Sequence, residues 1–216
     1  MKIKAIIFDM DGVLINSEPL WRQAEIETFA KVGLSFTDEM CMQTMGMRTS
    51  EVIEYWYGIT PWSGKSQKEV EIDLMQRVTQ LIIENGDAMK GVVFALKYFK
   101  EKGLKIALAS SSATSLIEVV IEKLKIRDYF EVIESAEYLD FGKPHPEIFI
   151  KTASKLGVQA SECLVIEDSF NGVLAAKSAR MKVIAIPDEE SKSDNQFVIA
   201  DYILDDLKQI KQIIIE

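Results

Sequence analysis

Residues 3–14 read IKAIIFDMDGVL, in which an apolar run ends at Phe8 and two carboxylates, Asp9 and Asp11, follow at once. The apolar run predicts a buried β-strand. Because side chains alternate in direction along a strand, Asp9 and Asp11 leave its carboxyl-terminal tip on the same side. Clustered carboxylates repel one another unless a cation lies between them. The stretch therefore indicates a hard cation, a reacting phosphate, or both, at the end of this strand.

Length and composition indicate one globular domain, or one domain with an insertion. The chain has 216 residues, of which 48% are hydrophobic, and a formal net charge of -9. The negative charge argues against a nucleic-acid partner, and no apolar run approaches the ~18 residues of a membrane helix. Cys41 and Cys163 lie far apart, so we expect two reduced packing residues. We accordingly expect a cytoplasmic monomer without a membrane partner.

Short apolar runs alternate with helical patterns from about residue 91 onward. Strands are predicted over residues 105–109, 130–133, 163–166 and 183–186. Helical stripes lie between them, and one of these is formed by Leu116, Val120 and Leu124. This alternation, with continuously apolar strands, predicts an α/β fold with a parallel, Rossmann-like sheet and helices on both faces.

Residues 16–86 break that alternation, because they contain no convincing strand. Ser17 is a candidate helix cap, and a capping box begins at Ser66 before a helical stripe of apolar residues. We therefore predict a helical cap domain over 16–86, inserted after the first strand into a core domain of residues 1–15 and 87–216. The alternative is that these helices pack on the sheet as one further layer.

Polar side chains also follow other predicted strands. Ser110, Ser111 and Ser112 lie at a strand-to-helix turn, where hydroxyl and backbone N–H groups can hold a phosphate. Lys143 lies in a loop stiffened by prolines, and Glu167 and Asp168 follow the strand over 163–166. Each pattern is weak alone, but ligands of open α/β sheets bind beyond the carboxyl ends of the strands. All of these groups are expected at that edge.

The ordered set resembles the haloacid-dehalogenase-like phosphohydrolases over essentially the full chain. The motifs that carry the resemblance are Asp9-Met10-Asp11-Gly12-Val13, Ser110, Lys143 before Pro144, and Glu167-Asp168 with Asn171-Gly172 beyond. Further segments are similar to the sugar-phosphatase branch, which includes 2-deoxyglucose-6-phosphate and hexitol phosphatases, with β-phosphoglucomutase a near relative. These segments are residues 16–21, Gly46-Met47-Arg48, residues 55–57 and Pro61-Trp62.

The resemblance implies a role for each motif. Asp9 would be the nucleophile that forms an aspartyl-phosphate, and Asp11 would protonate the leaving group and then deprotonate water. Mg²⁺ would be held by Asp9, the backbone carbonyl of Asp11 and Asp168, with Glu167 supporting it from behind. Phosphate and substrate contacts are expected from Ser110, Ser111, Lys143 and Asn171.

The cap is expected to set substrate choice and to exclude water. Glu18, Trp21 and Arg48 are its candidate contacts to the substrate. The alternative for Trp21 is packing, and the alternative for Arg48 is a surface ion pair. His145, the single histidine, is interpreted as a loop-packing residue and not as a base.

The leading hypothesis is a Mg²⁺-dependent phosphatase of small phosphorylated sugars or sugar alcohols that works through an aspartyl-phosphate. A dehalogenase is disfavoured, because it needs no general acid at Asp11. Two alternatives stay open: a β-phosphoglucomutase-like phosphomutase, and a phosphate-binding module without turnover. The complete set of Asp9, Asp11, Lys143 and Asp168 speaks against the binding module. The particular sugar is not identified by the sequence.

Overall fold

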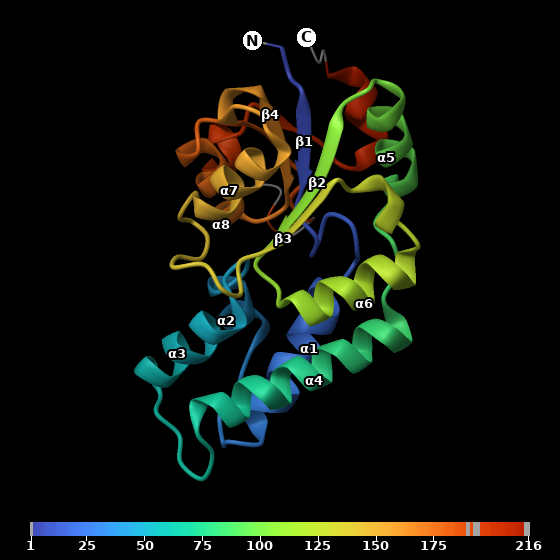
Figure 1. Cartoon of the computed structure of the whole chain (residues 1–216). Helices are drawn as coiled ribbons and strands as arrows, with labels where there is room; N and C mark the ends of the chain where they lie inside the picture. The colour runs from blue at the N-terminus through green and yellow to red at the C-terminus, as the bar shows by residue number, and fades with distance from the viewer. Residues whose placement is uncertain (1, 189–190, 192–194, 214–216) are drawn as a thin grey trace.

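The computed structural model describes residues 2–188, 191 and 195–213, and Figure 1 shows their arrangement. In the described residues, the strands form one sheet in the order β3-β2-β1-β4-β5-β6, and every neighbouring pair is parallel. They are β1 (Ala5–Phe8), β2 (Lys105–Ser110), β3 (Val132–Ser135), β4 (Cys163–Glu167), β5 (Lys182–Ala185) and β6 (Tyr202–Ile203). The predicted parallel sheet is confirmed, and β6 is an additional short edge strand.

The register of the sheet aligns the tips of its three central strands. Phe8 at the end of β1 lies opposite Leu108 of β2 and Ile166 of β4. The next residue, Asp9, donates its backbone N–H to the Ile166 carbonyl at 2.9 Å. The residues that follow these strands therefore meet at one edge, as their sequence positions predicted.

Helices cover both faces of the sheet because its side chains alternate in direction. Ile6 and Phe8 belong to the core cluster that includes residues of α5 and α6, whereas Ile7 belongs to the cluster that includes α7 and α8. Figure 1 shows α5 on one side of β1 and β2, and α7 and α8 on the other. The helices are α5 (Val92–Glu101), α6 (Thr114–Leu124), α7 (Glu147–Leu156) and α8 (Phe170–Ser178). Short 3₁₀ helices are η1 (Arg127–Tyr129), η2 (Ala160–Glu162), η3 (Asn195–Ile199) and η4 (Leu207–Gln212).

Residues 16–86, all of which are described, contain helices and no strand. The helices are α1 (Glu18–Ala30), α2 (Asp38–Gln43), α3 (Thr49–Ile59) and α4 (Gln67–Asn85). Their apolar faces enclose an aromatic cluster. The Phe36 ring stacks on the Phe29 ring with centroids 4.3 Å apart, and it meets the Trp56 ring edge-on with centroids 5.0 Å apart. Trp62 meets Phe29 at 5.8 Å, so both tryptophans are packing residues of this helical segment. The capping box predicted at Ser66 is present.

The chain leaves the sheet and returns to it through two adjacent segments. Ile15 and Ala88 form an antiparallel bridge, and the Asn16 N–H donates to the Asp87 carbonyl at 2.9 Å. Figure 1 shows α1–α4 beyond the end of the sheet that lies opposite the two chain termini. We propose residues 16–86 as a cap domain, and this pair of crossings supports the proposed boundaries. No helix of the described residues is long and apolar enough to cross a membrane.

Candidate active site

A buried lysine joins two carboxylates at the tips of β1 and β4. Lys143 Nζ lies 2.8 Å from Asp9 Oδ1 and 2.5 Å from Glu167 Oε1. All three side chains are buried. Burial opposes the ammonium charge, yet Asp9 and Glu167 together raise the pKa of Lys143 above its ordinary value. An ammonium has three N–H donors, so one remains for a further acceptor. The lysine is therefore a fixed charge beside Asp9.

Asp168 completes a cluster of three buried carboxylates. One oxygen each of Asp9, Glu167 and Asp168 lies within 4.8 Å of the others. Burial and the neighbouring Glu167 carboxylate raise the pKa of Asp9 to about 8, although Lys143 opposes the shift. Burial, followed by nearby acidic groups, raises the pKa of Asp168 well above its usual range. The cluster holds more negative charge than Lys143 offsets, so its residues fit a divalent cation with oxygen ligands.

Two glycines provide room for the carboxylate cluster because they have no Cβ atom. Gly12 follows β1 with φ +67°, and a Cβ at this position would lie 1.8 Å from Asp168 Oδ2. Gly172, in the first turn of α8, would place a Cβ 1.9 Å from Glu167 Oε1. Both glycines of the recognised motifs therefore provide close approach of backbone to buried carboxylates.

Asp11 points away from the cluster and has a different set of partners. Its Oδ1 accepts hydrogen bonds from Ser17 Oγ at 2.6 Å and Trp21 Nε1 at 2.9 Å. Its Oδ2 accepts from Ser112 Oγ at 2.8 Å. The side chain of Asp11 is thus held by neutral donors, whereas Asp9 faces a lysine and two carboxylates. This leaves the backbone carbonyl as the part of Asp11 that the predicted metal site can use.

Ser17 occupies the predicted N-cap position of α1, but its side chain does not cap the helix. Its backbone is already helical, at φ −103° and ψ −16°, and its side chain makes no cap hydrogen bond. The hydroxyl instead binds Asp11, six residues earlier. A capping serine and a serine that binds a catalytic carboxylate look the same in the sequence, which explains why this contact was not predicted.

The serine run that begins at the end of β2 contacts both the site and the helical segment. Ser110 is buried, and its Oγ accepts from the Ser112 N–H at 3.1 Å, which leaves its own hydroxyl proton for another acceptor. Ser110 and Ser111 both line a cavity next to Asp9, but the Ser111 Oγ donates to the Gly46 carbonyl at 2.8 Å. Ser110 is thus placed as the phosphate prediction requires, while the Ser111 hydroxyl is engaged with the cap.

Asn171 also binds the cap and does not line the cavity. Its Nδ2 donates to the Met45 carbonyl at 3.0 Å. Asn171 and Ser111 therefore hold consecutive carbonyls, at Met45 and Gly46, from two different strand tips. The Met45 carbonyl takes the Asn171 amide here, and the substrate contact expected of Asn171 stays a prediction.

Arg48 turns away from the cavity as well. Its guanidinium donates to the Leu139 carbonyl at 2.7 Å and to Glu51 Oε1 at 2.6 Å. Arg48 does not line the cavity around Asp9. Arg48 thus joins the start of α3 to the loop after β3, and its substrate contact stays a prediction. The pairing with Glu51 agrees with the alternative reading of an ion pair.

A narrow cavity connects Asp9 with the helical segment above it. About 70 Å³ is open to water, which is room for about five water molecules. The cavity is lined by Asp9, Asp11, Ser110, Ser111, Lys143 and Asp168 at the sheet, and by Glu18, Trp21, Arg22 and Glu25 of α1. The predicted residues Glu18 and Trp21 thus lie where a substrate would meet them.

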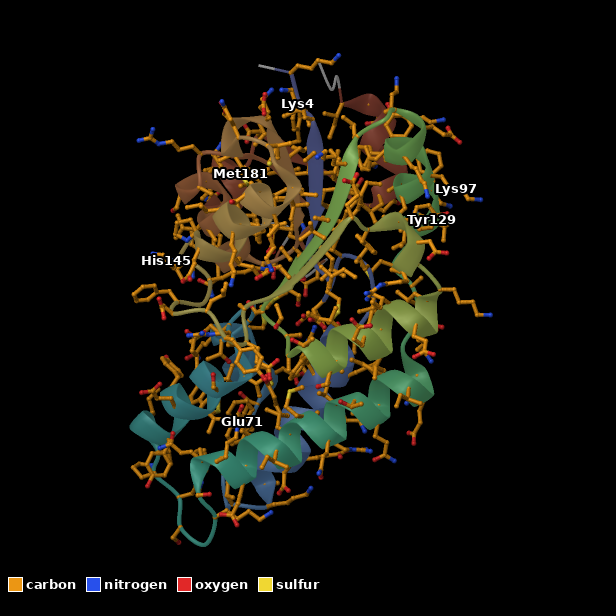
Figure 2. The ribbon with its side chains drawn as sticks, in the orientation of Figure 1. Lys4, Glu71, Lys97, Tyr129, His145 and Met181 are labelled. Atoms are coloured by element: carbon orange, nitrogen blue, oxygen red, sulfur yellow. The ribbon has the colours of Figure 1, made fainter. Side chains whose placement is uncertain are left out.

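His145 agrees with its interpretation as a loop-packing residue. It is exposed, its ring lies 4.5 Å from that of Phe141, and Nδ1 accepts from the Glu147 N–H at 3.3 Å. Figure 2 labels it at the outer edge of the molecule, on the side of α7.

The sequence did not single out Arg22 or Glu25 as site residues, and it placed Ser112 in the phosphate-binding turn without predicting its bond to Asp11. Ser112 binds a residue 101 positions earlier, and no local pattern reveals such a partner. Arg22 and Glu25 lie four and seven residues after Glu18 and so share its helical face, but this spacing does not show that the face lines a cavity.

Comparisons with known proteins agree with this geometry. The family described as "Haloacid dehalogenase-like hydrolase" matches residues 6–186. Hexitol phosphatase B of Escherichia coli (strain K12) is 40% identical over 210 residues, which cover 97% of this chain and 95% of that protein. CbbY from Rhodobacter sphaeroides, solved in complex with phosphate, is 26% identical with a TM-score of 0.87, over 96% of each chain. β-Phosphoglucomutase from Clostridium difficile is 27% identical with a TM-score of 0.84, over 96% of this chain and 93% of that one.

The chain therefore belongs to the haloacid dehalogenase-like hydrolases. Both the family and the phosphatase class that the sequence indicated are confirmed.

Proposed function

We propose that the protein is a Mg²⁺-dependent phosphatase that hydrolyses small phosphorylated sugars or sugar alcohols through an aspartyl-phosphate at Asp9. The observation that carries this proposal is the unequal setting of the two motif carboxylates. Asp9 faces Lys143 and a carboxylate cluster, while Asp11 is bound by hydroxyl and indole donors. These settings suit a nucleophile and a proton carrier respectively. The similarity to hexitol phosphatase B supports the substrate class.

The reaction divides into two displacements at phosphorus. In the first, an Asp9 oxygen forms a bond to phosphorus, the bond to the sugar oxygen breaks, and Asp11 gives a proton to the leaving alkoxide. In the second, Asp11 takes a proton from water, whose oxygen attacks phosphorus and releases phosphate and the Asp9 carboxylate. Each step uses the same proton carrier in opposite directions, so Asp11 ends as it began.

Ser110 and Lys143 are positioned to hold the phosphoryl oxygens. The Ser110 hydroxyl proton is available for them because, among the residues that the structure describes, the Ser110 Oγ only accepts from the Ser112 N–H. The third N–H of Lys143 is available because Asp9 and Glu167 take the other two. Donors that are already fixed before the reaction stabilise developing negative charge without reorganising. Ser111 would contribute from the same turn once its hydroxyl leaves the Gly46 carbonyl.

Asp9, Asp168 and the backbone carbonyl of Asp11 would hold Mg²⁺, with Glu167 supporting them from behind. The three-carboxylate cluster supplies the hard oxygen ligands that Mg²⁺ prefers. When bound, the ion removes the repulsion between the Asp9 carboxylate and the approaching phosphate. Lys143, through its contacts to Asp9 and Glu167, keeps these carboxylates in place.

The test is an Asp9→Asn variant, which removes the nucleophile with little change in shape. We expect no detectable aspartyl-phosphate and loss of turnover of hexitol and hexose phosphates, with the fold retained as measured by circular dichroism. The wild-type protein should lose activity in EDTA and regain it with Mg²⁺. Turnover by Asp9→Asn at the wild-type rate would refute the proposed mechanism.

A phosphomutase remains the second candidate, because β-phosphoglucomutase from Clostridium difficile shares the fold and 27% identity. Conversion of β-glucose 1-phosphate to glucose 6-phosphate without net phosphate release would favour it. The expectations of a cytoplasmic location and a monomeric state stay predictions, and size-exclusion chromatography with light scattering tests the latter.

A further inference from the structure

The cavity extends well beyond the reacting groups along one face of α1. Glu18, Arg22 and Glu25 line it. Seven residues separate Glu18 from Glu25, which is about 10 Å along a helix axis. A phosphate ester held at Lys143 would therefore extend past Glu18 toward Glu25, at the far end of the cavity. We call the part of the cavity that runs along α1, lined by Glu18, Arg22, Glu25, Cys41 and Thr44, the cap end.

Glu25 is an unusual residue for this position. It is only 7% exposed, yet it lines the cavity. The donor found for its carboxylate among the described residues is the Cys41 thiol, a weak one. Burial raises the pKa of Glu25 to about 7, so the environment provides little compensation for its charge. A buried carboxyl of this kind gains free energy from any ligand that supplies a hydroxyl donor.

The cations near the cavity are committed to other partners. Arg22 lies 3.7 Å from Asp188. Arg48 binds Leu139 and Glu51, outside the cavity, and Lys143 binds the carboxylates at the sheet. In the described part of the chain, the cap end thus presents the Glu18 and Glu25 carboxyl groups together with the Arg22 guanidinium, and the pairing of Arg22 with Asp188 leaves no excess of positive charge there.

The charge and hydrogen bonding of the cap end distinguish between two kinds of substrate. Glu18 and Glu25 can bind hydroxyl groups whether they are ionised or protonated, because a carboxyl group accepts hydrogen bonds in both states. In neither state do they offer positive charge to a second phosphate. Like charges placed together at a binding site cost several kcal/mol. The cap end therefore favours a neutral polyhydroxyl chain and disfavours a second anionic group.

We propose that the cap end is a hydroxyl-binding subsite in which Glu25 helps to select monophosphate esters of neutral polyols and sugars and to reject bisphosphates. This inference rests on the proposed phosphatase function. It has a consequence for the open choice between phosphatase and phosphomutase. A sugar phosphomutase that works through an enzyme-bound phosphate must accommodate a bisphosphate of its substrate, and this cap end disfavours that species.

The test compares matched substrates on the wild-type protein by phosphate release. Fructose 6-phosphate is paired with fructose 1,6-bisphosphate, and glucose 6-phosphate with glucose 1,6-bisphosphate. We expect kcat/KM to be at least about 100-fold lower for each bisphosphate. Equal kcat/KM within a pair would overturn the inference while leaving the phosphatase function intact. If neither acetyl phosphate nor any one of the four sugar phosphates is hydrolysed, the proposed function itself is refuted.

A Glu25→Gln variant tests the residue, with Glu54→Gln on the exposed face of α3 as the matched control. For hexose monophosphates we expect Glu25→Gln to raise KM about tenfold with little change in kcat. Its kcat/KM for acetyl phosphate, which is too short to reach the cap end, should stay within about twofold of the wild-type value. A purely structural role would lower both activities together, and that result would overturn the assignment. Glu54→Gln should match the wild-type protein on both substrates.

Discussion

Replacing Gly12 with alanine tests whether the backbone after β1 positions the metal-binding carboxylates. The added Cβ would lie 1.8 Å from Asp168 Oδ2, whereas real Cβ contacts essentially never fall below 3.0 Å. The carboxylate must therefore retreat by about 1.2 Å, the difference between these two distances. A misplacement of about 1 Å in a catalytic site can cost about 100-fold in rate.

A second glycine separates this effect from the cost of the backbone conformation. Gly33 has a similar conformation, at φ +84°, but a Cβ there would meet nothing within 4 Å. Both alanine variants should lose about 1–2 kcal/mol of unfolding free energy, because L-residues disfavour this region. Only Gly12→Ala should also lower kcat/KM by about 100-fold and raise the Mg²⁺ concentration needed for half-maximal activity.

The assay combines chemical denaturation with activity measured over a Mg²⁺ titration. The reasoning would be refuted if Gly12→Ala matched Gly33→Ala in both kcat/KM and Mg²⁺ dependence. It would also be refuted if the added methyl group left Asp168 in place in a crystal structure.

Two further predictions concern the charges of the site. Lys143→Met leaves Asp9 and Glu167 buried without their cation, so unfolding in EDTA should become easier by about 3–5 kcal/mol, and Mg²⁺ should restore part of the loss. Burial is the largest cause that raises the pKa of Asp9 from 3.8 and the pKa of Glu18 from 4.5, in each case to about 8. At pH values between the unfolded and the folded pKa, the folded protein therefore binds more protons than the unfolded one. The melting temperature in EDTA should accordingly fall as pH rises from about 5 to 9, and Mg²⁺ should flatten this dependence; a melting temperature that rises with pH in EDTA would contradict it.

The sequence allowed the sheet and the phosphate end of the site to be predicted, because both follow from local signals. Apolar runs mark strands wherever both faces are covered, and parallel strands place the residues after them at one edge. Asp9, Ser110, Lys143 and Asp168 were found in this way, and the structure brings all four to one cavity.

The cap end was not predictable in the same way. A helical pattern shows which residues share a face of α1, but not whether that face meets packing, solvent or a cavity. Glu25 could thus be recognised only after α2 and α3 were placed opposite it. The contacts that Arg48 and Asn171 make here were not predicted for a related reason, since their acceptors are backbone carbonyls far away in the sequence. Backbone carbonyls occur at every residue, so no motif reports that one of them will be a partner.

The two carbonyls that anchor the cap have a consequence for how this protein can change. Asn171 and Ser111 bind main-chain oxygens of Met45 and Gly46, so the side chain at position 45 can be replaced without removing either bond. Position 46 is different, because a Cβ there would lie 2.6 Å from Ser169 Oγ. Substitutions at position 45 can therefore change the surface of the cap next to Gly46, and new substrate preferences can arise without loss of the docking that brings the cap onto the site.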